Sequence, residues 1–518
     1  MVEDANPSSK GVKTYGSITA FAVAVNYIIG AGVFGLPFAF YEAGIPLTFV
    51  TLCFFAFFLV LLAGWVLEII ARAHGWTEFS DKRPGGRNLG SVNQSQGDGS
   101  DSLPLLGESK PRNRIGYEVI SYTRFSRVFG GRKGMILTQT MIVLYSLGSL
   151  WAYVATVGSS VAMLGFEFFV KDETCNIYHE PSEKCQHTYY YSVLAYAVVA
   201  IPLSLLAIAE QRVLQVVLTV YRFVAFAVML VSVAVAWAIG GPYQPFDSSS
   251  DPSVFSSSLD SSSHVGSIWG FKWSGFGLMF PSAALALNLH WNIPDVVAPA
   301  KNKKPMLAVL GSAQIVSLIF YIAIGSVCGI YFNPPDPLVT LNWGHYTGHN
   351  GGWGPGDQLW WAKIVELVIV CFPILNLINV FPLVAVSLAS NVEALFPDVE
   401  EPQEHGKVFN FFFGPSADSR HRHVVIRFYC CIPPMILGAL VGKLNIIFTI
   451  SGMFGFILEF IIPTIFHIVS SNFLVTRFGP GSDKTPYTYW ASKRFWVLLT
   501  LIIGTAACIA AIVFTILG

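Results

Sequence analysis

The chain has 518 residues, of which 53% are apolar and only 12% are charged. Because an average soluble domain is about 25% charged, this composition excludes a string of ordinary soluble domains and indicates that a lipid bilayer is the solvent. The 31 basic and 31 acidic residues cancel to a formal net charge of zero, so the chain lacks the basic excess that nucleic-acid binding requires.

Apolar runs long enough to cross a bilayer recur along the whole chain. A transmembrane helix needs about 20 mainly apolar residues, and about eleven such runs are present. Their approximate bounds are 18–42, 47–71, 134–165, 189–208, 214–240, 274–299, 306–331, 359–389, 424–442, 446–469 and 495–517. Transmembrane β-strands would alternate apolar and polar residues, and these runs do not. We therefore predict an all-α polytopic membrane protein with about eleven transmembrane helices.

The distribution of Lys and Arg predicts the orientation, because basic loops stay in the cytoplasm. With the N-terminus inside, 25 of the 31 basic residues fall in the inner segments. Eleven spans then place the C-terminus on the extracytoplasmic side. The first seventeen residues are polar and the first apolar run is too long for a cleavable signal peptide, so we expect none.

The spans divide into two groups of five and one final helix. The predicted segments are a cytoplasmic tail (1–17), a first five-helix repeat (18–240), an extracytoplasmic Ser-rich loop (241–273), a second five-helix repeat (274–470), a cytoplasmic loop (471–494) and helix 11 (495–518). The inner stretch 80–114 is rich in Gly, Ser, Asn and Pro, and we predict that it is a disordered loop.

Cysteine usage is consistent with this topology. Cys175 and Cys185 share the predicted outer loop 166–188, where an oxidising compartment favours a disulfide over two unpaired thiols. The other six cysteines lie in apolar spans and are expected to pack as small apolar residues. The sequence contains no zinc-like Cys/His spacing, nucleophile–base pair or phosphate loop, so we predict no metal, no cofactor and no enzymatic activity.

The first span is interrupted in its middle. Gly30, Gly32 and Gly35 precede Pro37, and these residue types weaken a helix because glycine is entropically costly and proline lacks a backbone donor. In lipid such a break persists only where it is buried or lines a wet cavity. Close helix packing is the alternative explanation for the small residues.

The sixth span has a comparable interruption. Pro281 and Pro294 enclose a stretch that carries Asn288, His290 and Asn292 at membrane depth. A hydrogen-bonded core histidine is the alternative for His290. Spans one and six are corresponding members of the two five-span halves, and paired interrupted helices at such positions indicate a transporter with inverted repeats and a site near the midplane.

Three tracts resemble the amino acid/auxin permease family of amino-acid transporters, within the amino acid–polyamine–organocation superfamily. Residues 29–44 resemble its first-helix signature and read Ile-Gly-Ala-Gly-Val-Phe-Gly-Leu-Pro-Phe-Ala-Phe-Tyr-Glu-Ala-Gly. Residues 290–302 are similar to the tract that closes its sixth helix, and residues 448–463 to its tenth helix. A weaker likeness to the third helix covers 153–158.

The resemblance extends over residues 18–517 and departs from the family in the 80–114 loop and at Asn288 and Asn292. It implies a leucine-transporter-like fold, in which a 5+5 inverted repeat with discontinuous helices 1 and 6 is followed by an extra helix 11. It also implies secondary active transport of amino acids by alternating access, coupled to protons or sodium.

An α-amino acid is a zwitterion, so its site must offer donors to the carboxylate and acceptors to the ammonium group. Half-helix N-termini supply free N–H groups, and unwound carbonyls supply acceptors. We expect the first break to bind the carboxylate, the second to bind the ammonium group, and a tyrosine of span three to close the pocket or simply to pack. The predicted substrate-binding residues are Asn26, Ile29, Gly30, Ala31, Gly32, Val33, Tyr145, Leu285, Ala286, Leu287 and Asn288. No acidic residue lies in the centres of spans one, three and six, which favours a neutral substrate.

The coupling ion is indicated by spans five and eight. The resemblance implies sodium ligands from span one and Ser or Thr hydroxyls from span eight, but span eight offers Asn376 and Asn379 and no hydroxyl before Ser387. Arg222 lies about eight residues into span five, where its charge could replace sodium. Alternatively, it could snorkel to the inner interface.

Arginine does not release a proton, so His290 or Glu459 would have to titrate. Glu459 lies in the inner half of span ten, and an acid at membrane depth indicates function. It could relay protons, contact a cationic substrate or pair with another polar group. We expect protons rather than sodium as the coupling ion.

The inner loop also bears on location and on a second hypothesis. Asp101-Ser-Leu-Pro-Leu-Leu106 matches an acidic dileucine signal, so Asp101, Leu105 and Leu106 could bind a sorting adaptor. The protein would then lie in an endosomal, lysosomal or vacuolar membrane, with the plasma membrane as the alternative. The long loop also permits an amino-acid sensor that signals to cytosolic partners instead of transporting.

Overall fold

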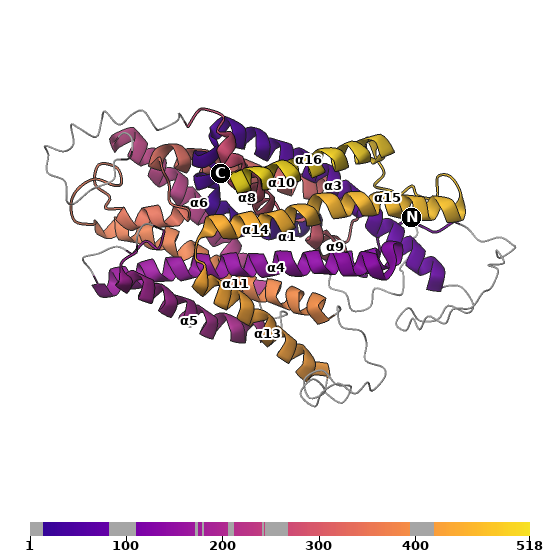
Figure 1. Cartoon of the computed structure of the whole chain (residues 1–518), viewed down its shortest axis with the longest axis horizontal. Helices are drawn as coiled ribbons and strands as arrows, with labels where there is room; N and C mark the ends of the chain where they lie inside the picture. Colours follow the sequence, from indigo (N-terminus) through magenta and orange to yellow (C-terminus); the bar gives the residue numbers. More distant parts are fainter. Residues whose placement is uncertain are drawn as a thin grey trace.

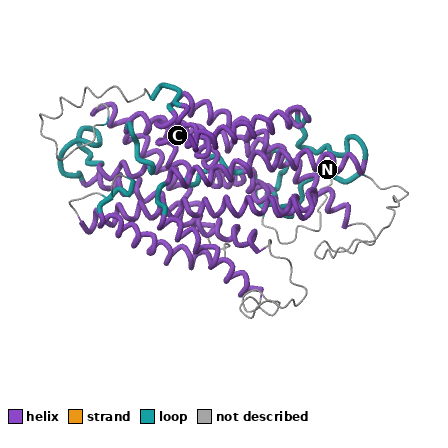
Figure 2. Tube along the Cα trace, in the orientation of Figure 1, coloured by secondary structure: helices purple, strands orange, loops and turns teal. Residues whose placement is uncertain are grey.

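The computed structural model describes residues 14–81, 110–170, 175–178, 181–205, 212–240, 243, 268–393 and 419–517. Within these ranges every regular element is a helix, and Figure 2 shows loops confined mainly to short connections and to the two ends of the bundle. The helices run side by side along the long axis of the molecule (Figure 1). The predicted all-α fold class is confirmed.

The continuous long helices agree with most of the predicted spans. They are α3 (Ile45–Asp81), α4 (Tyr122–Val170), α5 (Glu183–Leu205), α6 (Arg212–Gly240), α10 (Met306–Phe332), α11 (Trp360–Glu393), α13 (Ser419–Leu440) and α16 (Arg494–Leu517). In the described part of the chain, eight helices are long and apolar enough to cross a membrane, or nine if one bent pair counts as a span. The count of eleven is not established, because the sixth predicted span is broken into short helices and the apolar part of the ninth, Val424–Leu440, is short.

The bent pair is the first predicted span. It consists of α1 (Ser17–Ile28) and α2 (Gly32–Ala43), whose axes differ by 57° across the break. The break contains Ile29, Gly30 and Ala31. The break therefore falls at Gly30, directly before α2. Pro37 does not break the chain further, because it lies inside α2.

The sixth predicted span is also divided. α8 (Phe276–Ala286) ends in an irregular stretch, which is followed by a 3-10 turn, η4 (His290–Asn292), and by the short helix α9 (Ile293–Val297). Pro294 lies in the first turn of α9, where a missing N–H group costs nothing. This residue therefore restarts the helix.

The tenth predicted span contains an irregularity that periodicity alone does not indicate. α14 (Leu444–Phe456) passes into a π-helical turn, η6 (Ile457–Ile461), and then into α15 (Ile462–Phe478). Single π-turns inside α-helices are frequent at functional sites. Glu459 lies in this turn.

Several predicted boundaries differ from the observed ones at the inner end. α3 continues to Asp81, and α4 begins at Tyr122 rather than near 134, with a kink at Gly131 (φ 59°). Apolar runs mark the bilayer and not the helix ends, so polar helical turns beyond the bilayer are missed. Residues 110–114 of the predicted disordered loop are described, and Asn113 Nδ2 donates to the carbonyl oxygens of Ser482 (2.7 Å) and Lys484 (3.0 Å).

Residues 82–109 of that inner loop, with the dileucine motif, lie outside the described residues, as does nearly all of the Ser-rich outer loop. On the predicted outer side, Cys175 and Cys185 form the expected disulfide, with their Cα atoms 5.3 Å apart. The other six cysteines are free thiols.

A connection on the predicted outer side, which the sequence did not single out, packs against the bundle. Residues between α10 and α11 form the 3-10 helix η5 (Val339–His345), which contacts α2, α4 and α11. Trp343 Nε1 donates to Ser232 Oγ of α6 at 3.1 Å. The connection therefore joins helices of both predicted repeats.

Candidate functional site

The two broken spans meet at their breaks. A Cβ atom placed on Gly32 would lie 2.6 Å from Ala286 Cα, so the start of α2 touches the end of α8 with no room for a side chain. Tyr321 of α10 joins the C-terminal ends of α1 and α8. Its hydroxyl is the donor to the carbonyl oxygens of Ile28, at 3.0 Å, and of Ala286, at 2.9 Å. One tyrosine thus ties the last turns of α1 and α8 together.

The start of α2 presents backbone donors at this junction. Its N-cap residue, Ala31, forms no side-chain cap, and the first N–H groups of a helix have no intrahelical acceptor. A Cβ atom on Gly30 would lie 3.7 Å from Tyr153 Oη, its nearest neighbour. The positive end of the α2 dipole therefore lies beside a tyrosine hydroxyl and a residue without a side chain, an arrangement that suits a carboxylate.

The second break is held open from two sides. Gln314 Nε2 of α10 donates to the carbonyl oxygen of Leu287 at 3.2 Å. The backbone N–H of Leu289 donates to Glu459 Oε1 at 3.1 Å. Backbone groups that a regular helix would pair internally are therefore paired with side chains, which is the condition for irregular backbone at membrane depth.

Between these anchors, Asn288 lies with an unpaired side chain. It is only 3% exposed, and neither Nδ2 nor Oδ1 has a hydrogen-bond partner among the described residues. A Cβ atom on Gly455 of α14 would lie 3.3 Å from this Nδ2 and 3.0 Å from Tyr145 Cε2. The ring of Trp291 meets that of Tyr145 edge to face, with centroids 6.1 Å apart.

Two tyrosines of α4 therefore lie at different breaks. Tyr145, the predicted site residue, lies at the second break beside Asn288, whereas Tyr153 lies at the first break beside Gly30. Tyr153 was missed as a site residue, although it opens the 153–158 tract that resembles the family's third helix. Tyr321 and Gln314 were also missed, since nothing in span seven marks them.

Two of the predicted ammonium acceptors already have partners. The carbonyl oxygens of Ala286 and Leu287 accept from Tyr321 and Gln314. Each carbonyl oxygen has a second lone pair, so both can accept another donor. Leu285 and Ala286 are themselves buried, in the last turn of α8.

Arg222 lies in the interior and does not snorkel. It is 4% exposed; its Nη1 donates to Asn26 Oδ1 at 3.0 Å and its Nη2 to Asn376 Oδ1 at 2.5 Å. The guanidinium group of α6 thus connects α1 with α11. Asn26, which the sequence predicted to bind substrate, accepts a hydrogen bond from this guanidinium group. Asn379 lies one helical turn beyond Asn376 on α11.

His290 and Glu459 form a buried pair behind the second break. Neither is exposed, and His290 Nδ1 lies 3.5 Å from Glu459 Oε1. The other ring nitrogen, Nε2, lies 2.8 Å from the carbonyl oxygen of Leu59 on α3. The same carboxylate oxygen that faces the imidazole holds the Leu289 N–H, so the pair is joined directly to the backbone of the break.

The ends of the broken spans on the predicted inner side are joined as well. The N–H of Tyr15, ahead of α1, donates to the carbonyl oxygen of Pro299, and the N–H of Lys301 donates to that of Tyr15, at 3.1 and 2.9 Å. The Tyr15 hydroxyl donates to the carbonyl oxygen of Val296 at 2.7 Å. Lys303 Nζ donates to carbonyls at the end of α9, and burial lowers the pKa of Lys303 to about 8.

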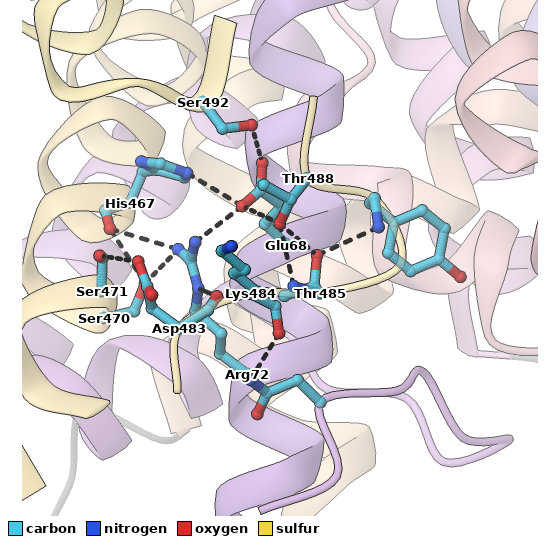
Figure 3. Close-up of polar contacts among 12 residues, drawn as sticks. Glu68, Arg72, His467, Ser470, Ser471, Asp483, Lys484, Thr485, Thr488 and Ser492 are labelled. Carbon is cyan, nitrogen blue, oxygen red and sulfur yellow. Dashed lines mark hydrogen bonds and ion pairs between the residues drawn. The ribbon is translucent and has the colours of Figure 1, made fainter. Parts of the chain in front are cut away.

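A second polar cluster lies between α3, α15 and the connection from α15 to α16 (Figure 3). Arg72 Nη2 donates to Glu68 Oε2 at 2.7 Å, and both side chains are buried. His467 Nε2 lies 3.4 Å from the same oxygen of Glu68. The hydroxyl groups of Thr488 and Ser492 donate to the two oxygens of this carboxylate.

Arg72 completes the cluster with donations to Ser470 Oγ at 3.1 Å and to the carbonyl oxygen of Asp483 at 2.8 Å. Arg72 directly follows the predicted second span, 47–71, and lies within α3, which continues beyond that apolar run. Glu68 and Arg72 are four residues apart and therefore lie on one helix face, and this spacing is the sequence feature that could have predicted the ion pair. We refer to Glu68, Arg72 and His467 as the inner ion cluster.

Comparison with known proteins indicates the family of the chain. A family model described as "Transmembrane amino acid transporter protein" matches residues 102–517. The match therefore covers most of the chain and begins after the 29–44 tract.

Several curated relatives match over nearly their whole length. A "Transmembrane protein 104 homolog" of Caenorhabditis briggsae is 21% identical over 523 residues, covering 95% of each chain. Transmembrane protein 104 of Homo sapiens is 20% identical over 527 residues, covering 95% of this chain and 96% of the relative.

Among solved structures, MhsT in complex with L-phenylalanine superposes with a TM-score of 0.50 at 12% identity, covering 97% of this chain and 100% of that one. At this identity the likeness concerns the fold alone. It is the leucine-transporter-like fold expected from the sequence.

Proposed function

Because the chain belongs to the transmembrane amino acid transporter family, we propose that it carries a neutral amino acid across a membrane by alternating access, with protons as the coupling ion. Such a protein is a multi-pass secondary transporter and not an enzyme. The observation that carries the proposal is the contact between the two breaks, at Gly32 and Ala286, under the shared hydroxyl of Tyr321.

The junction is suited to both charged ends of an α-amino acid. The N–H groups at the start of α2, from Ala31 to Val33, would bind the carboxylate, with the Tyr153 hydroxyl beside Gly30 as a further donor. The carbonyl oxygens from Leu285 to Asn288 would bind the ammonium group. Asn288 and Tyr145 beside the second break are neutral, and Glu459, the acid at this break, already faces the Leu289 N–H and His290, which supports a neutral substrate.

Arg222 supports protons over sodium. Its guanidinium group links α1, α6 and α11, which are the helices of spans one, five and eight, and a fixed positive charge there would repel a sodium ion. Arginine holds its proton at any physiological pH. The charge would therefore act as a permanent substitute for the cation.

The exchangeable proton would be carried by the His290–Glu459 pair. Protonation of Glu459 would weaken its bond to the Leu289 N–H, since a carboxylate accepts more strongly than a neutral acid. The second break would then be freer to move when a proton is bound. This link between the proton site and the break is the basis of the proposed coupling.

The orientation follows from the basic inner segments, with the N-terminus in the cytoplasm and the C-terminus outside. The disulfide between Cys175 and Cys185 supports it, because disulfides persist in oxidising compartments. The membrane is the plasma membrane or that of an endosome, lysosome or vacuole.

Uptake into proteoliposomes tests the proposal. The purified full chain is reconstituted, and uptake of labelled neutral amino acids is followed with and without an inward proton gradient. We expect saturable uptake that a protonophore abolishes and that replacement of sodium by choline leaves unchanged.

Each alternative has its own outcome in this assay. No saturable uptake of any amino acid would contradict transport, and saturable binding without uptake would identify the sensor. Loss of uptake in choline would show sodium coupling. Ionic currents far above carrier rates would indicate a channel.

A further inference from the structure

We infer that Asn288 selects an amino acid whose side chain ends in a carboxamide, that is, glutamine or asparagine. The inference rests on the proposed function and adds the chemical class of the substrate side chain. Its starting point is the carboxamide of Asn288 in the second break, which is buried and has no partner in the described part of the chain.

An unpaired buried amide is costly. Leaving a buried donor or acceptor unsatisfied costs about 1–3 kcal/mol per group, and folded proteins pair the great majority of such groups. The neighbouring residues of the break are paired, since Leu287 and Leu289 are held by Gln314 and Glu459. Asn288 alone in this stretch presents both a donor and an acceptor to a missing partner.

The residue that packs against this amide is a glycine. Gly455 lies opposite on α14, where any Cβ atom would lie 3.3 Å from Asn288 Nδ2 and 3.0 Å from the Tyr145 ring. A side chain at this position would press against both groups, so glycine leaves the amide of Asn288 without a neighbouring side chain from this residue. Ser451, one turn earlier on α14, also has a buried hydroxyl without a partner among the described residues.

The rings of Tyr145 and Trp291 supply an apolar wall, because they meet edge to face next to the amide. Such a wall would pack against the methylene groups of a ligand side chain. The methylene groups would thus be held by the rings, and the end of the side chain would lie at Asn288.

The geometry of the amide decides between polar side chains. Asn288 offers an N–H donor and a carbonyl acceptor side by side in one plane. A second carboxamide matches both in a cyclic pair of hydrogen bonds, whereas a single hydroxyl oxygen cannot align with both at once. A carboxylate would match the donor and face the acceptor oxygen unfavourably. The complementary neutral group is a carboxamide.

The test compares near-isosteric substrates. Glutamine is matched with methionine and asparagine with leucine, so that each pair differs mainly in hydrogen-bonding capacity. For the wild-type chain in proteoliposomes we expect kcat/KM to be at least about tenfold higher for the carboxamide of each pair, the effect of one to two hydrogen bonds.

The variant Asn288→Leu should reduce this ratio to about one by lowering glutamine uptake about tenfold or more relative to methionine uptake. The matched control is Asn445→Leu, at the outer start of α14 and away from the breaks, which should keep the wild-type ratio. Equal loss of both substrates in Asn288→Leu would overturn the inference.

Ligand binding by the wild-type protein keeps the inference testable if Asn288→Leu fails to fold. Glutamine should raise the melting temperature of the purified protein more than methionine at equal concentration. Equal shifts, or no wild-type preference in uptake, would overturn the carboxamide assignment while leaving transport intact. Absence of uptake and binding for every amino acid would instead contradict the proposed function.

Discussion

At the scale of single residues, the interior of this protein contains charged side chains, whose burial in an apolar bundle is costly and typically indicates function. A buried cation is tolerated only when it is hydrogen-bonded. Arg222 meets this condition through two neutral amide oxygens, on Asn26 and Asn376. These partners accept from Nη1 and Nη2 without cancelling the charge, and Nε has no partner among the described residues, so the positive potential remains where α1, α6 and α11 meet.

Replacing this arginine tests whether the link matters. Arg222→Met removes both the charge and the bonds to α1 and α11, and we expect uptake to fall at least about tenfold, the effect of losing 1.4 kcal/mol or more. Arg222→Lys keeps the charge but lacks the planar fork that reaches two partners, so it should retain part of the activity. Full uptake by Arg222→Met in proteoliposomes would rule out the proposed role.

The carboxyl group of Glu459 provides a sharper test of coupling. Glu459→Gln keeps the size of the side chain and an acceptor for the Leu289 N–H but cannot bind and release a proton. Exchange of internal for external substrate should persist, while accumulation driven by a proton gradient should be lost. Glu366→Gln, which alters a buried carboxyl group at the outer part of α11, is the control. Gradient-driven accumulation by Glu459→Gln would contradict the account.

At the scale of elements, the sequence predicted where the two helices break, but not which side chains of other helices bind the broken segments. Glycine and proline act on the backbone of their own segment, so the interruptions in spans one and six could be located from local chemistry. Tyr321, Gln314 and Glu459 act across spans, and which polar side chain meets which break depends on how the helices pack. The same limit explains why Tyr145 was predicted and Tyr153 was not, although both lie on one helix.

The contact between the breaks makes a steric prediction. In Gly32→Ala the new methyl group would lie 2.6 Å from the backbone of Ala286, so α2 and α8 would be forced apart, and overpacking of this kind costs about 1–3 kcal/mol. In the matched variant Gly30→Ala the nearest atom is 3.7 Å away, so stability should be little changed. Melting temperatures of the purified variants measure the difference, and equal values would show that the breaks do not touch.

At the scale of the whole molecule, the sequence sorted most basic residues to one side, and this ordering predicted the topology. A count of basic residues does not distinguish a loop from the end of a long helix, and Arg72 lies in such a helix end. The structure buries this arginine in the inner ion cluster, which joins α3 and α15 to the connection before α16 (Figure 3). The contacts span about 400 residues of sequence, for example between Arg72 and Ser470, and no local pattern encodes them.

The cluster should act as a rigid joint at the inner face. Arg72→Met leaves the Glu68 carboxylate without its main partner, and breaking a buried ion pair typically costs about 3–5 kcal/mol. Arg124→Met removes an ion pair with Glu118 whose side chains are 39% and 62% exposed, and such pairs contribute about 0–1 kcal/mol. Thermal unfolding in detergent should therefore show a much larger loss for Arg72→Met, and similar losses would contradict a structural role for the cluster.

The central claim is that the two breaks form one amino-acid site, and a structure of the full chain with bound glutamine tests it most directly. We expect the ligand carboxylate at the N–H groups of Ala31, Gly32 and Val33, the ammonium group at the carbonyl oxygens that end α8, and the side-chain amide on Asn288. Ligand bound elsewhere in the bundle, with the junction of α2 and α8 unoccupied, would contradict the account.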